Sequence, residues 1–193
     1  MIEFRWKTLR IAVHFSFFAV LLLMLELIKS DWGLWCAGAA LFHETGHLLA
    51  YTAAGTLPRE IHLECGGIRI VPPAVRFPPK TEAAILFAGS GANFLACGIL
   101  CLFRCRTAAG FHLLLGIFNL LPLPSLDGGQ LLSLLADQLF SPRRGELFCR
   151  TAAILTILPL LWEGWQIFQE NGNFTLLLSL FCLIISAFPL KRN

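Results

Sequence analysis

The sequence predicts an all-α polytopic membrane protein with about six transmembrane helices and a small β-hairpin between the second and the third. Hydrophobic residues make up 56% of the 193 residues and charged residues only 14%, whereas soluble domains carry about 25% charged residues. The mean hydropathy is +0.71. Several apolar stretches are long enough to cross about 30 Å of hydrocarbon. We expect one membrane-embedded domain over residues 1–193, because these stretches leave no room for a soluble module.

Six apolar stretches account for the predicted spans. A cleaved signal peptide is not expected at the first of them, because charged residues stand where a cleavage site would lie. The spans are Ile11–Ile28, Trp32–Ala54, Glu82–Phe103, Phe111–Phe140, Leu147–Phe168 and Phe174–Leu190.

The first span carries polar residues near its two ends, His14 and Glu26. From these positions either side chain can reach headgroups or water, which explains both without a functional role. His14 lies at the predicted cytoplasmic end, on the side toward which the second span carries its own polar residues. Its role stays open.

The second span contains His43-Glu44-Thr45-Gly46-His47 inside an otherwise apolar run. Because residues four apart share one face of a helix, His43 and His47 can direct ring nitrogens at a single zinc ion. Glu44 lies beside that point, where it can accept a proton from water rather than bind the metal. Ionisable groups are costly in hydrocarbon, so we prefer a functional cluster over the alternative of a mutually satisfied polar core.

The connection from Gly55 to Thr81 is the one long predicted segment outside the membrane. Apolar and polar residues alternate on both sides of Gly66-Gly67, which predicts a β-hairpin. Two strands alone are only marginally stable, so we expect the hairpin to lean on the helices or on the membrane surface.

The third span contains a run of small residues, Ala88–Asn93. Small residues let another helix backbone approach closely, and Asn93 places an amide in hydrocarbon. Helix packing with one interhelical hydrogen bond would explain this run, and a role for Asn93 in a site is equally open.

The fourth span is interrupted at Asn119–Gly129, where two prolines and two glycines break the helix. Broken backbone at membrane depth is tolerated where protein shields it or where it lines a wet cavity. Asp127 alone would most often be a helix N-cap. Because two histidines need a third ligand, we favour Asp127 as that ligand. A His/His/carboxylate set leaves one position open, as a catalytic zinc requires.

The distribution of lysine and arginine predicts a multi-pass protein of the cell membrane with both termini in the cytoplasm. Twelve of the fifteen basic residues fall on one side of the six spans, and the exceptions are Lys29, Arg104 and Arg106. The anionic leaflet of the lipid bilayer explains this bias, so no nucleic-acid partner is expected. Four of the seven cysteines fall in predicted spans, Cys65 and Cys149 fall on or near the reducing side, and we expect free thiols. Cys97, Cys101 and Cys105 could form a soft metal site, but packing is preferred.

Taken together, these motifs resemble the site-2 protease family of intramembrane metalloproteases over about residues 10–140, and the helices at 147–190 lie beyond that core. The resemblance rests on His43–His47, the element Gly89–Asn93, and Asn119-x-x-Pro122 followed by Asp127-Gly128. It is closest to the sporulation branch, which processes the pro-form of the mother-cell sigma factor K. Members of that branch similarly carry a Gly-Gly hairpin in place of a PDZ insertion.

The resemblance implies one zinc ion held by His43, His47 and Asp127, with Glu44 as catalytic base. It also implies that Asn93 lies near the substrate backbone or the oxyanion. Ser90 stands where the family commonly has proline, so the shape of that turn is open. We expect no PDZ or CBS domain, so regulation by ATP is not implied.

The predicted function is therefore zinc-dependent hydrolysis of peptide bonds in membrane-spanning or membrane-associated proteins, with a pro-sigma or anti-sigma factor as candidate substrate and a regulatory membrane partner. We expect the strand around Ile68–Ile70 to hold unwound substrate by main-chain hydrogen bonds. Two alternatives are a catalytically silent homologue that binds transmembrane segments and a membrane metal transporter. A transporter would need ligands along a path, whereas the sequence shows one compact cluster.

Overall fold

The computed structural model describes residues 2–6, 9–19, 22, 31–64, 67–174, 176–178, 180, 181 and 184. The chain divides into two compact units, Met1–Phe118 and Asn119–Asn193, and each is described by itself.

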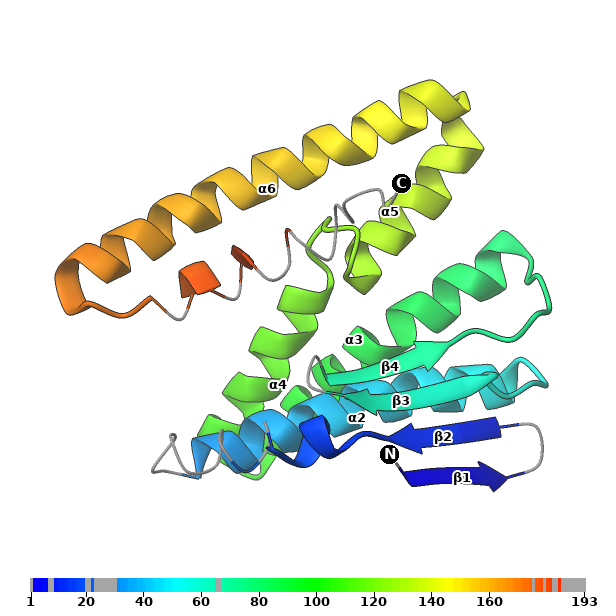
Figure 1. The fold of residues 1–193 in the computed structure, drawn as a ribbon, viewed down its shortest axis with the longest axis horizontal. Helices are drawn as coiled ribbons and strands as arrows, with labels where there is room; N and C mark the ends of the chain where they lie inside the picture. Colours follow the sequence, from blue (N-terminus) through cyan, green and yellow to red (C-terminus); the bar gives the residue numbers. More distant parts are fainter. Residues whose placement is uncertain are drawn as a thin grey trace. The chain divides into compact units, whose positions relative to one another are not determined.

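The first unit contains a four-stranded sheet (Figure 1). Its order is β1-β2-β3-β4, with β1 and β2 antiparallel, β2 and β3 parallel, and β3 and β4 antiparallel. The last pair is the predicted hairpin, which is confirmed. The strands are β1 Ile2–Trp6, β2 Leu9–Val13, β3 Glu60–Glu64 and β4 Gly67–Val71.

The two N-terminal strands were not predicted, and the first predicted span, Ile11–Ile28, is wrong at its start because it begins inside β2. Leu9 and Ala12 of β2 are buried, since this strand lies between β1 and β3. Its apolar character therefore comes from a central place in a sheet rather than from lipid. Residues 20, 21 and 23–30 lie outside the described part of the chain.

Three helices complete the first unit: α2 Trp32–Ala53, α3 Pro79–Leu102 and α4 Arg106–Asn119. The second and third predicted spans correspond to α2 and α3. These two helices pack closely at Gly46, where a Cβ atom would lie 2.5 Å from the carbonyl oxygen of Ala88 and 2.8 Å from the Cβ of Ala92. The predicted close approach at the small residues of the third span is thus observed.

The second unit contains α5 Asp127–Leu139 and α6 Pro142–Asn171, which pack against each other. The helix break predicted within Asn119–Gly129 is confirmed, because α4 ends and α5 begins there. The loop backbone folds over the first turn of α5: a Cβ at Gly128 would collide with the carbonyl of Leu120, and one at Gly129 with that of Leu123. Glycine is therefore required at both positions.

Among the described helices, α3 and α6 are long and apolar enough to cross a membrane by length and composition. Large apolar side chains such as Leu147 and Trp162 are exposed along α6. The count of six spans stays a prediction, and most of Phe174–Leu190 lies outside the described residues. The five cysteines that the structure describes are free thiols, as predicted.

Candidate metal centre

Two histidines of α2 form the centre of the site. His43 and His47 lie one helical turn apart, are only 4% and 8% exposed, and have their Nε2 atoms 3.1 Å apart. Two nitrogens each 2.0–2.1 Å from one tetrahedral zinc ion would lie about 3.3 Å apart. The observed separation fits a pair of ligands to a single ion.

A backbone hydrogen bond orients the second of these imidazoles. The Nδ1 of His47 donates to the carbonyl oxygen of Ile85 on α3, at 2.8 Å. In neutral histidine this leaves the lone pair on Nε2. Metal-binding histidines are commonly fixed in this way by an acceptor on their other nitrogen.

The first imidazole is held by an amide. Asn93 on α3 is fully buried, and its Nδ2 donates to the Nδ1 of His43 at 3.3 Å. The amide oxygen of Asn93 accepts from the Nδ1 of His112 on α4, at 2.9 Å. Asn93 thus lies beside His43 with its amide engaged by two imidazoles, and its role near the substrate or the oxyanion stays a prediction.

Gly89 leaves the space in front of the two histidines open. A Cβ atom there would collide with the Nε2 of His47 and lie 2.6 Å from the Nε2 of His43. Helix α3 continues unbroken through Ser90, so serine in place of the family proline leaves a regular helix. The Ser90 hydroxyl is buried with no hydrogen-bond partner among the described residues.

Glu44 follows His43 directly in α2 and is half-buried. One residue along a helix is a rotation of about 100°, so the carboxylate projects from the face next to that of the two imidazoles. This is the placement that a base beside a metal requires, and its catalytic role stays a prediction.

Asp127 is the first residue of α5, in the second unit. The N-cap position belongs to Leu126, whose backbone is extended and whose side chain makes no capping hydrogen bond. The alternative interpretation of Asp127 as the N-cap is therefore not the observed arrangement. Its carboxylate is half-buried, and its role as third ligand stays a prediction.

His14 directly follows strand β2. Its backbone N–H donates to the carbonyl of Leu63 at 2.9 Å, and its ring lies 6.3 Å from that of His62. His62 in turn lies 2.8 Å from Glu60 (Nε2 to Oε2). This hydrogen bond holds the pKa of the Glu60 carboxyl below its usual value.

Two comparisons with known proteins found similar proteins. The family model described as Peptidase family M50 matches residues 105–160. The fold is similar to that of a solved site-2 protease from Methanocaldococcus jannaschii, with a TM-score of 0.67 and 20% identity over 100% of this chain and 97% of that chain. The predicted resemblance to the site-2 protease family is confirmed. No curated protein matches the sequence significantly.

The partial match to peptidase family M50 agrees with the predicted metalloprotease activity. The matched segment covers α4, α5 and part of α6, so it contains Asp127 but not the histidine pair. The pair lies in α2, within the part of the fold that resembles the solved site-2 protease. Membership of the sporulation branch stays a prediction.

His112 is a site residue that the sequence reasoning missed. It stands alone among apolar residues near the start of the predicted fourth span. An ionisable residue in a membrane span is a functional candidate by default, and this signal was present. No spacing rule connected it to the metalloprotease motif, because its partner Asn93 lies on another helix.

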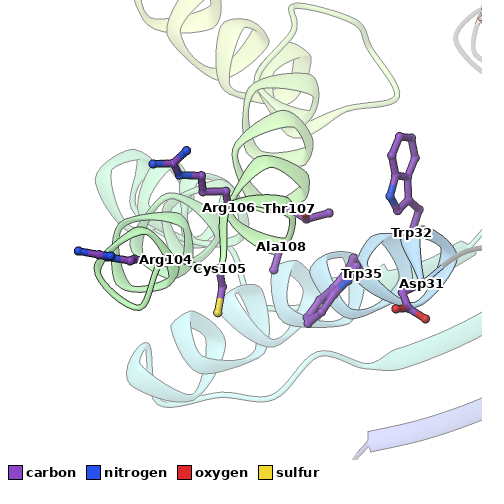
Figure 2. A pocket seen from close by; sticks show the side chains of 8 residues that line it. All are labelled: Asp31, Trp32, Trp35, Arg104, Cys105, Arg106, Thr107 and Ala108. Carbon is purple, nitrogen blue, oxygen red and sulfur yellow. The ribbon is translucent and has the colours of Figure 1, made fainter.

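A separate hollow of about 520 Å³ lies between the start of α2 and the turn from α3 to α4 (Figure 2). Trp32, Trp35 and Asp31 line one side of it. Arg104 and Arg106 also line the hollow, and Figure 2 shows their guanidinium groups pointing away from Trp32 and Asp31. Tryptophan and arginine at a helix end are typical of the membrane–water interface.

Proposed function

We propose that this chain is an intramembrane zinc metalloendopeptidase. The observation that carries the proposal is the buried pair His43 and His47, with Nε2 atoms 3.1 Å apart at a space that Gly89 leaves open. Two converging imidazoles supply metal ligands and the adjacent carboxylate of Glu44 supplies a base, which is the pairing that zinc hydrolases use.

Asp127 completes the proposed ligand set for one zinc ion. Support comes from its place in the first turn of α5, directly after the broken segment. Two imidazoles and one carboxylate leave a fourth position for water or substrate. A closed structural site would not leave that position.

When bound, zinc supplies a Lewis acid that polarises the scissile carbonyl and makes water nucleophilic near neutral pH. Glu44 accepts the proton of the attacking water and delivers it to the leaving amine. The carbonyl of Ile85 and the amide of Asn93 keep the two imidazoles oriented. The predicted oxyanion or substrate role of Asn93 requires its amide to turn away from His43.

The proposed substrates are membrane-spanning or membrane-associated proteins. In a helical substrate the carbonyls are engaged in hydrogen bonds to residues four positions on, so the segment must unwind before attack. The proposal places the enzyme in the cell membrane, with both termini cytoplasmic and a membrane partner as regulator. A pro-sigma or anti-sigma factor is the candidate substrate that the sporulation-type hairpin suggests.

Glu44→Gln is the decisive variant. We expect it to abolish cleavage of a co-expressed tagged substrate while zinc stays bound, because the change removes the base and leaves every proposed ligand in place. Zinc is measured in the purified protein by elemental analysis, and cleavage by the size of the tagged product.

The matched controls are His43→Ala, His47→Ala and Asp127→Ala, each of which should lower zinc occupancy together with cleavage. Loss of zinc in Glu44→Gln would contradict the assignment of Glu44 as base. Full zinc in Asp127→Ala would remove Asp127 from the ligand set. A wild-type protein that holds zinc but cleaves none of the candidate substrates would favour the silent homologue.

A further inference from the structure

A chain of hydrogen-bonding groups leads from the ligand pair to His112 on α4. The Nε2 of His43 lies 3.1 Å from that of His47, and the Nδ1 of His43 accepts from Asn93 at 3.3 Å. The other end of the same amide accepts from the Nδ1 of His112 at 2.9 Å. The buried amide of Asn93 is therefore held between imidazoles from two different helices.

Packing fixes the ring of His112 in this place. The ring meets that of Phe42 edge to face, with centroids 5.5 Å apart and planes at 85°, and Phe42 directly precedes His43 in α2. One turn further along α4, a Cβ atom at Gly116 would lie 2.7 Å from the Cε1 of Phe94 on α3. Helix α4 thus approaches α3 closely enough to hold His112 against Asn93.

We propose that His112 is a positioning residue of the metal centre, which acts through Asn93 to keep the Nε2 of His43 directed at the metal. The proposal rests on the proposed metalloprotease function. A neutral histidine that binds a metal through Nε2 carries its proton on Nδ1, and that N–H needs an acceptor. Asn93 can provide its oxygen by turning its amide over.

The turned amide explains why an imidazole suits position 112. After the turn, the NH₂ group of Asn93 faces His112 and needs an acceptor in place of the former donor. The Nδ1 of histidine can act as either, because the ring exchanges its single proton between two nitrogens. His112 therefore satisfies the buried amide with or without a metal on His43.

Three variants of the full-length protein in detergent test this role. His112→Leu fills the space without a hydrogen bond, and His112→Asn keeps a group near Nδ1 that can donate or accept. Leu113→Ala is the control, because Leu113 is the exposed neighbour on the same helix. Co²⁺ is the probe, with its affinity measured against a competing chelator and its ligand geometry read from the visible spectrum.

We expect His112→Leu to weaken Co²⁺ binding by about 10–100-fold and to change the spectrum, as is typical when the partner of a ligand is lost. His112→Asn should regain most of the affinity, and Leu113→Ala should match wild type. In an Asn93→Ala background, His112→Leu should add little, because the two residues act in series. The thermal midpoint of the metal-free His112→Leu protein should match that of Leu113→Ala.

Wild-type affinity and spectrum in His112→Leu, with binding abolished in His43→Ala, would overturn this inference and leave the proposed function standing. Equal losses of Co²⁺ affinity in His112→Leu and His112→Asn, together with a lower thermal midpoint of metal-free His112→Leu, would show that His112 acts only through packing. That result would also overturn the inference. A wild-type protein that binds no Co²⁺ would overturn both the inference and the proposed function.

Discussion

Asn93 has one side-chain amide, and two roles compete for it. The sequence predicts contact with the substrate or the oxyanion, whereas the structure shows the amide fully buried between His43 and His112. If the main role of Asn93 is to orient the imidazole of His43, Asn93→Ala should weaken zinc binding about 10–100-fold. Saturating zinc should then restore much of the cleavage. Titrating cleavage against free zinc in the variant and in wild type measures this. Full zinc affinity with a persistently low rate would favour the oxyanion role.

At the scale of single residues, the sequence was informative where the chemistry is local. His43, Glu44 and His47 share two turns of one helix, so their spacing alone predicts their relation. The hydrogen bond between His112 and Asn93 joins two helices, so no periodic pattern in the sequence predicts it. The extended backbone of Leu126 makes this residue the N-cap of α5 and Asp127 the first residue of the helix. The sequence alone does not determine these backbone angles.

Helix α3 is the element that shapes the space in front of the histidines, and Gly89→Ala tests it. The added methyl would occupy the space beside both Nε2 atoms, so we expect zinc binding and cleavage to be lost. Gly98→Ala on the same helix is the control, because its Cβ would meet nothing within 4 Å. That control should bind zinc normally and gain up to about 1 kcal/mol of helix stability. Normal zinc in Gly89→Ala, measured by elemental analysis, would contradict the proposed metal position.

Strand β4 ends the sheet, so its outer edge pairs with no other described strand. An unwound substrate segment could add to this edge through main-chain hydrogen bonds. We expect photo-crosslinkers at Ile68–Ile70 to capture substrate in Glu44→Gln, a variant that should hold substrate without cleaving it. A crosslinker at Phe4 on β1, the opposite edge, should capture none. Crosslinks at Phe4 alone would exclude β4 as the docking strand.

Most helices and the β-hairpin could be predicted from local sequence patterns, whereas strand β2 could not. Helices α2, α3 and α6 follow from long apolar runs, and the hairpin follows from alternation around two glycines. The first predicted span takes in the second half of β2, because the pairing of β2 with β3 joins residues about fifty positions apart and leaves no local pattern. Such pairing depends on the folded chain rather than on a local pattern.

At the scale of the whole molecule, the parallel pairing of β2 with β3 constrains the orientation in the membrane. It ties the N-terminal segment to the connection between α2 and α3, and strands of an open sheet do not pair across hydrocarbon. Both segments must therefore lie on one side, which the distribution of arginine and lysine predicts to be the cytoplasm. The end of α6 near Asn171 is predicted on the opposite side.

Single cysteines at the exposed positions Arg5, Arg76 and Asn171 test this arrangement in a cysteine-free background. With a membrane-impermeant thiol reagent on intact cells, we expect Asn171→Cys to react and both Arg5→Cys and Arg76→Cys to stay protected. Permeabilised cells, in which all three should react, control for accessibility. Different labelling of Arg5→Cys and Arg76→Cys would contradict the shared sheet, because β2 and β3 could not then pair. If Arg5→Cys and Arg76→Cys both react while Asn171→Cys stays protected, the shared sheet stands but the orientation in the membrane is the reverse of the predicted one. The proposed docking strand would then lie on the outer side of the membrane, away from any cytoplasmic sigma factor.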